Sequence, residues 1–151
     1  MRWEDCQRAF YIDGSLRDIY IFQTSTDDWE KLLSFALALD QVIYYRIDGE
    51  IASLPKRATS IFNNREHTHT MSIDLTGVIV NCHFFMIEEI ELDIDPREIK
   101  SQNELDIVIK FIKELGKCLK KDAIVTEENS PNDIWFKYIS DEDKITFQIP
   151  N

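Results

Sequence analysis

Three histidines have the residue type and spacing that a metal site requires. His67 and His69 are two residues apart, so on a strand their side chains share a face, and His83 lies on the next predicted strand. Imidazole nitrogens are common metal ligands in proteins. If Thr76-Gly77 forms a two-residue turn, however, the resulting register places His69 and His83 on opposite faces of the hairpin. A one-residue slip would join the histidines but would scramble the better apolar face, so we expect no metal site.

Four acidic residues alternate with aliphatic residues and form what we call the acidic ladder: Glu89, Glu91, Asp93 and Asp95. On a strand, alternate side chains share a face and lie about 6.6–7 Å apart. Carboxylates at this spacing suit a glycosidase pair, a site for a hard cation, or a stripe that docks a basic protein partner. The plainest alternative is a solvated strand face, kept charged against edge-to-edge pairing. Among the functional interpretations, the docking stripe is favoured because nothing indicates a sugar-binding groove.

A second set of candidate residues, His83, Asp74 and Asn81, projects from the polar face of the hairpin that contains Thr76-Gly77. Imidazole and carboxylate groups can transfer protons, and an amide can orient a ligand. These residues define an alternative hypothesis of a small enzyme, or of a ligand-binding or metal-binding protein, with a pocket between helix and sheet. The chain has no glycine-rich phosphate loop, nucleophile elbow or His-Glu-x-x-His motif, so we assign no catalytic residue and no cofactor.

The charge of the chain is strongly acidic. Its 151 residues include 17 Lys and Arg against 28 Asp and Glu, for a formal net charge of −11. Such a surface repels phosphate backbones and anionic lipid headgroups, so we expect neither a nucleic-acid partner nor a membrane partner. The acidic start of the chain is unlike a secretory signal. The densest apolar stretch, Leu32–Leu39, is far shorter than the roughly 20 residues of a membrane span.

The cysteines indicate a reducing compartment. Cys6, Cys82 and Cys118 are far apart in the sequence. An odd number without a close pair argues against a disulfide framework and against a Cys-x-x-Cys site. We therefore expect thiols that behave as small apolar residues, and a cytoplasmic protein.

Turn residues between apolar runs predict the hairpins that position the candidate residues, because glycine adopts a positive φ without steric cost. The expected hairpins pair 7–12 with 16–24, 41–48 with 50–54, 67–75 with 78–86, and 133–140 with 144–150. We also expect strands over 89–95 and 123–127, a loop over 129–132, and a short helical turn at 58–63. Aromatic residues alternate between the faces of these strands, so those that are not core can form a binding surface.

Two amphipathic helices complete the predicted domain. The first opens at Thr26 or Asp27, with Glu30 reaching back, and its apolar residues cover more than half of its circumference. The second spans about 102–120 and opens with a capping box, Ser101-x-x-Glu104. The length matches one domain. We therefore predict a single α+β domain over residues 1–151, with a largely antiparallel sheet built from hairpins and two main helices packed on one face.

Three runs, Asp13–Tyr20, Asn81–Phe85 and Asn129–Pro131, resemble stretches of small stand-alone bacterial proteins of no assigned function. In length, acidity and α+β pattern, the chain is also similar in a generic way to immunity proteins of bacterial toxin systems. This resemblance implies a class and transfers no site residues. We predict a non-enzymatic, acidic protein-binding module, with an immunity protein that neutralises a basic toxin as its concrete form. The alternatives are the small enzyme or ligand binder, and a homodimer that covers the apolar stripe of the first helix.

Overall fold

A nine-stranded antiparallel sheet organises the chain, with strand order β3-β2-β4-β5-β6-β1-β7-β8-β9. The computed structural model describes all residues from Met1 to Asn151. The strands are β1 (Arg17–Phe22), β2 (Val42–Ile47), β3 (Glu50–Ile51), β4 (His69–Asp74), β5 (Ile79–Met86), β6 (Glu89–Ile94), β7 (Ala123–Glu127), β8 (Ser130–Ile139) and β9 (Lys144–Phe147). The predicted α+β domain with a largely antiparallel sheet is confirmed.

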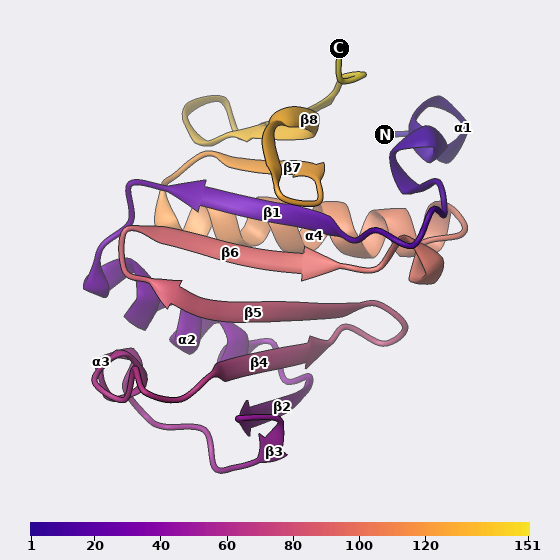
Figure 1. Ribbon diagram of the computed structural model, residues 1–151. Coiled ribbons are helices and arrows are strands. Elements are labelled where there is room, and N and C mark those ends of the chain that lie inside the picture. Colours follow the sequence, from indigo (N-terminus) through magenta and orange to yellow (C-terminus); the bar gives the residue numbers. More distant parts are fainter.

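Both long helices lie behind the sheet in Figure 1, so they cover the same face. The helices are α1 (Trp3–Cys6), α2 (Thr26–Ala38), α3 (Ala58–Phe62) and α4 (Gln102–Leu119), and the 3-10 turns are η1 (Gln7–Phe10), η2 (Pro96–Glu98) and η3 (Ser140–Glu142). Helices α2 and α4 contact each other through Phe35 and Phe111, whose ring centroids are 5.8 Å apart. The opposite face, toward the viewer, carries neither long helix, and we call it the open face.

The core lies between the helices and the sheet. In β6, Ile90, Leu92 and Ile94 are fully buried on the helix side, and the acidic residues between them therefore point to the open face. Trp29 of α2 is also fully buried. Most of the apolar stripe of α2 is covered within the chain in this way, although Leu37 is exposed. No helix has the length and apolarity needed to cross a membrane.

The first predicted hairpin is wrong. Residues 7–10 form η1, and β1 pairs with β6 and β7 instead of with the preceding segment. The side chain of Arg17 explains the difference, because it binds the preceding segment directly. Its Nε donates to the Ala9 carbonyl (2.6 Å) and its Nη2 donates to the Tyr11 carbonyl (3.1 Å). A buried guanidinium thus replaces the backbone ladder that the Asp13-Gly14 turn predicted.

The other three predicted hairpins are confirmed, and the register of β4 with β5 is the expected one. Thr70 lies opposite His83, and Ser72 lies opposite Asn81. The loop predicted over 129–132 is wrong, because β8 begins at Ser130. Strand β8 includes most of the predicted loop, because shifts in register keep it paired with β7 as far as Glu127 and Ser130.

The helix starts differ in detail from the prediction. The N-cap of α2 is Ser25, whose hydroxyl accepts from the Asp28 amide in a capping box. Glu30 does not reach back to the helix start, because it accepts from the Arg57 side chain and from the amide of Ala58, the first residue of α3. Asp28, at the third helical position, therefore completes the capping box of α2, and Glu30 connects α2 to α3.

Candidate functional site

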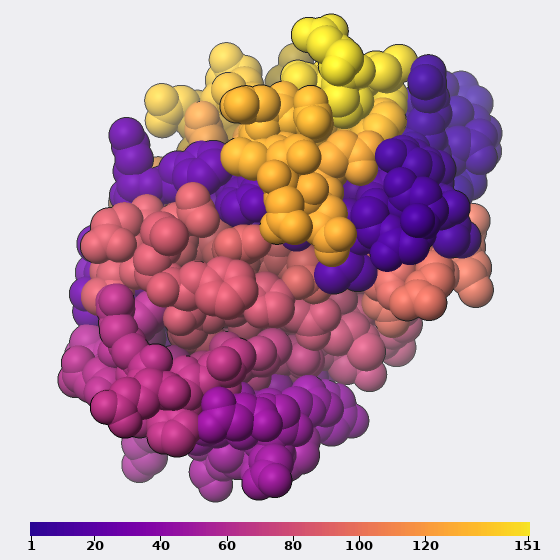
Figure 2. Space-filling view, viewed as in Figure 1, coloured from indigo at the N-terminus to yellow at the C-terminus, as the bar shows by residue number.

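Polar side chains from four neighbouring strands gather at the centre of the open face. Strand alternation turns these residues away from the helices, and antiparallel register places them side by side. We call them the polar cluster, and its members are Asp18, Ser72, Asn81, His83, Glu91 and Asp93. Figure 2, seen from the same side as Figure 1, shows that strands β4 to β6 present a broad surface on this side.

Asp93 is the centre of the hydrogen bonds in this cluster. Its Oδ2 lies 2.5 Å from His83 Nε2, and its Oδ1 accepts from Asn81 Nδ2 at 2.9 Å. The Ser72 hydroxyl extends the chain by donating to Asn81 Oδ1 at 2.7 Å. The carboxylate therefore holds both the imidazole and the amide in fixed orientations.

Asp18 lies directly opposite Asp93 on the neighbouring strand β1. Its Oδ2 accepts from the Tyr20 hydroxyl (3.1 Å) and from the Asn129 amide (2.7 Å), which comes from the β7–β8 turn. Burial nevertheless raises the pKa of Asp18 above its ordinary value. Burial also raises the pKa of Glu91, and the nearby charge of Asp18 adds to that rise. These shifts are caused chiefly by burial, and repulsion between neighbouring carboxylates adds to them.

The hydrogen bond that His83 donates to Asp93 raises the pKa of His83, and burial of the imidazole opposes that rise. A histidine with a raised pKa in the folded state binds its proton more tightly than in the unfolded chain. The resulting stability is present below the ordinary histidine pKa of 6.5 and is lost as the pH rises through the folded value. The raised pKa values of Asp18 and Glu91 likewise make the fold more stable at lower pH. Their contribution begins to fall once the pH rises above their ordinary pKa values of 3.8 and 4.5, which is further into the acid range.

We therefore expect the free energy of unfolding to fall as the pH rises above about 6.5, the ordinary histidine value. His83→Gln should remove this component, and Asp93→Asn should remove it too because the partner carboxylate is lost. Urea unfolding between about pH 5.5 and 8.5 measures the effect. An unchanged pH dependence in both variants would contradict the assignment.

The structure divides the acidic ladder. Glu89, Glu91 and Asp93 lie on β6 and on the open face, whereas Asp95 follows the strand. Asp95 accepts from the Arg97 amide (2.9 Å) and pairs with its guanidinium (2.7 Å), so it caps η2. Strand β6 also lies between β5 and β1. Protection of a sheet edge therefore does not explain the ladder.

The alternative set of His83, Asp74 and Asn81 is divided as well. His83 and Asn81 meet at Asp93, so the two predicted sets share one cluster. Asp74 instead accepts from the Thr76 amide (2.9 Å) in the β4–β5 turn. The face that holds these residues is the one turned away from the helices.

Asp18 was not among the predicted site residues. It reaches the cluster through the pairing of β1 with β6, which are far apart in the sequence. The only local signal was the alternation of Asp18, Tyr20 and Phe22 with aliphatic residues in β1.

The other two histidines lie apart from this cluster. His69 is buried on the helix side, and its Nδ1 lies 2.5 Å from the Tyr45 hydroxyl. His67 is close to Asp48 Oδ2 (2.6 Å). No group of three or more His, Cys, Asp or Glu side chains is arranged to hold a metal ion.

Exposed aromatic rings flank the polar cluster. Phe85 is 58% exposed and stacks on His83, with ring centroids 5.1 Å apart. Phe22 is partly exposed and stacks on Tyr20 at 5.4 Å. Tyr44 of β2, on the other side of the cluster, is 43% exposed. Aromatic side chains beside polar groups are typical of protein interfaces.

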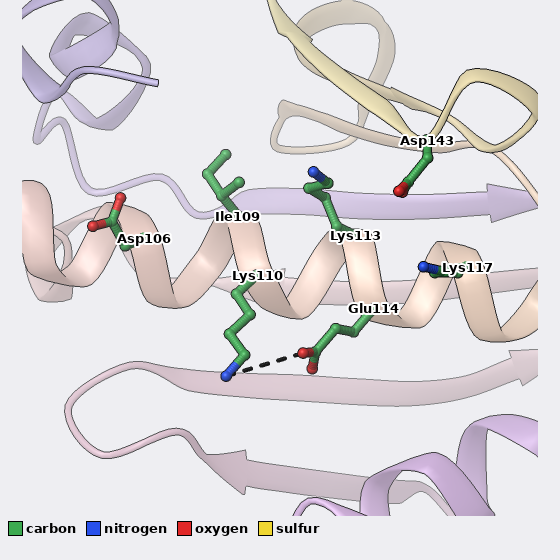
Figure 3. Close-up of a pocket in the computed structure, with 7 residues that line it drawn as sticks. All are labelled: Asp106, Ile109, Lys110, Lys113, Glu114, Lys117 and Asp143. Carbon is green, nitrogen blue, oxygen red and sulfur yellow. Dashed lines mark ion pairs between the residues drawn. The ribbon is translucent and has the colours of Figure 1, made fainter.

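None of the five principal cavities is lined by His83, Asn81 or Asp93. One of them is a groove of about 400 Å³ along the outer side of α4, in which Figure 3 shows charged side chains and the Lys110–Glu114 ion pair. Its only hydrophobic lining residue is Ile109. The polar cluster thus lies outside these cavities, with Asp18, Ser72 and Asp93 buried and the other members partly exposed.

Comparison of the chain with known protein families, curated proteins and solved structures finds no match. The fold and the site together define the protein as a single α+β domain with acidic side chains on the sheet face that neither long helix covers.

Proposed function

We propose that the protein is a non-enzymatic binding module whose open face docks a basic protein partner. The observation that carries this proposal is the group of carboxylates on the sheet face that neither long helix covers, where Asp18 and Asp93 are buried and Glu89 and Glu91 are partly exposed. We call this surface the docking face: the polar cluster, Glu89 and the flanking aromatic residues Phe22, Tyr44 and Phe85.

Charge complementarity supports a basic partner. The chain has a net charge of −11. Burial chiefly raises the pKa of Glu91, and repulsion from Asp18 adds to that rise. A positively charged partner surface would relieve that repulsion. Such attraction accelerates association and makes its rate fall with salt. The exposed aromatic rings would supply the apolar contacts that anchor an interface.

The contacts within the cluster support binding more than catalysis. A hydrolytic serine must contact its general base. The Ser72 hydroxyl instead donates to Asn81, and the His83 Nε2 is held by Asp93. These groups therefore stabilise one another in a fixed polar surface.

The test compares three baits: the natural chain, the docking-face variant Glu89→Gln/Glu91→Gln, and the matched control Asp141→Asn/Glu142→Gln. The control removes the same charge at η3, where neither side chain makes an ion pair or side-chain hydrogen bond. We expect the natural chain and the control to capture the same basic protein from the native host at low salt. With that protein purified, the association rate of the docking-face variant should fall about tenfold. Equal rates for all three baits, or no basic protein captured, would contradict the proposal.

The concrete form of this proposal is an immunity protein that neutralises a basic toxin. The captured partner should then arrest growth when it is produced alone. Co-production of the natural chain should restore growth, and co-production of Glu89→Gln/Glu91→Gln should restore it less. If the captured partner does not arrest growth, the immunity role is excluded and the proposal of a binding module stands.

We also propose a cytoplasmic location, where glutathione keeps thiols reduced. Cys6, Cys82 and Cys118 are all free, and the first two are buried.

A further inference from the structure

A cavity of about 550 Å³ lies on the open face, next to the polar cluster. Strands β1, β7 and β8 form its floor and sides, and the turn that follows α4, residues 120–122, closes one side. Its lining residues include Tyr20, Phe22, Lys120, Lys121, Ile124 and Lys137. This volume is within the range of pockets that bind small molecules.

Apolar groups form the floor and one wall of this cavity. Tyr20 lies opposite Ile124 in the sheet, and Ile124 lies opposite Lys137, so the three side chains form a row across β1, β7 and β8. The rings of Tyr20 and Phe22 stack nearly in parallel, with an interplanar angle of 10°. The Tyr20 hydroxyl is bound to Asp18, which fixes the ring. A planar apolar group of a ligand could lie against this wall and the Ile124 floor.

Three lysines give the same cavity a positive rim. Lys120 and Lys137 make no ion pair, while Lys121 lies 3.8 Å from Asp28. The carboxylate of Asp122, at the rim, accepts from the Ser140 amide. Asp122 is thus already engaged, and the ammonium groups of Lys120 and Lys137 have no ion-pair partner in a chain whose net charge is −11. This local reversal of charge next to an apolar floor fits a ligand with an apolar body and an anionic end.

We propose that this cavity binds a small aromatic carboxylate. Its ring would pack on Phe22 and Ile124, and its carboxylate would accept from the ammonium groups of Lys120 and Lys137. A single negative charge is favoured over a phosphate dianion because Glu91 and Glu89 lie directly across from Tyr20 and Phe22 on β6. The proposal goes beyond the docking of a basic partner and does not depend on it.

The test is a titration of the full chain with phenylacetate, followed by the amide resonances of the lining residues in NMR spectra. Two probes separate the contributions: acetate lacks the ring, and phenylacetamide lacks the charge. We expect phenylacetate to shift the resonances of Ile124 and Lys137 and to bind at least about tenfold more tightly than either probe.

Variants localise the site. Lys120→Gln/Lys137→Gln and, separately, Phe22→Ala should each weaken phenylacetate binding at least about tenfold. The matched control Lys110→Gln/Lys117→Gln alters two lysines of the groove in Figure 3 and should bind as the natural chain does. Thermal unfolding checks that each variant is folded, and Phe22→Ala provides a second test if the lysine variant is not. Glu89→Gln/Glu91→Gln should retain phenylacetate binding, which separates this proposal from the docking face.

Three results would overturn the proposal. One is equal binding of phenylacetate and phenylacetamide, and another is binding that folded Lys120→Gln/Lys137→Gln or Phe22→Ala leaves unchanged. The third is a set of shifted resonances centred on α4 instead of on β1, β7 and β8.

Discussion

Arg17→Met should lower the free energy of unfolding by about 3–5 kcal/mol, the range for breaking a buried charged contact by removing one partner. The Arg17 side chain is fully buried. Its guanidinium donates to the carbonyls of Ala9, Tyr11 and Leu16 and lies 3.5 Å from Glu127. Methionine fills much of the same volume but leaves these acceptors without their donor, and unsatisfied buried polar groups are costly.

The loss should be largest in the segment before β1, because Arg17 holds that segment. Urea unfolding measures the global change, and amide hydrogen exchange of residues 3–11 should show faster local opening. Glu127→Gln is the matched control: it removes the charge, keeps an acceptor for the Tyr11 hydroxyl and Trp135 Nε1, and should cost less than Arg17→Met because the guanidinium keeps its carbonyl acceptors. Equal losses in the two variants would show that the guanidinium hydrogen bonds do not anchor the segment.

Gly116→Ala should destabilise the protein by about 1–3 kcal/mol, the usual cost of overpacking a core. In an exposed helix the same change would stabilise by up to about 1 kcal/mol, because alanine is the better helix former. Here an added Cβ would lie 2.4 Å from Tyr138 Cδ1 and 2.5 Å from Cε1. The Tyr138 ring cannot easily move away, because it is buried and its hydroxyl donates to Asp143 Oδ1 at 2.8 Å.

A double-mutant cycle isolates this contact. Tyr138→Leu removes the ring, so Gly116→Ala in that background should cost little or even stabilise α4. Chemical denaturation of the four proteins provides the energies. The same cost of Gly116→Ala in both backgrounds would mean that the ring is not the obstacle.

Local features of the sequence predicted much of the secondary structure. The Thr76-Gly77 turn set the β4–β5 register, and it placed His69 and His83 on opposite faces as expected. Apolar periodicity located α2 and α4 within a few residues. These features depend on neighbours in the chain, so the sequence carries their signal directly.

The first hairpin shows where local signals fail. The Asp13-Gly14 turn and the apolar residues around it are compatible with a hairpin, but Arg17 and the pairing of β1 with both β6 and β7 are more favourable. Tertiary contacts of this kind override turn propensity because a central strand satisfies its backbone on both edges. No window of the sequence reveals which distant strands will pair.

By itself, the sequence determined the acidic charge, the two helices, three of the hairpins, and the side of β6 on which its carboxylates lie. Only the tertiary structure decided that β6 is an interior strand, that Asp93 joins the ladder to His83 and Asn81, and that Asp18 lies opposite. The physical reason is the range of the interactions. Alternation and turn geometry act over a few residues, whereas strand order results from burying both helices against one face of the whole sheet.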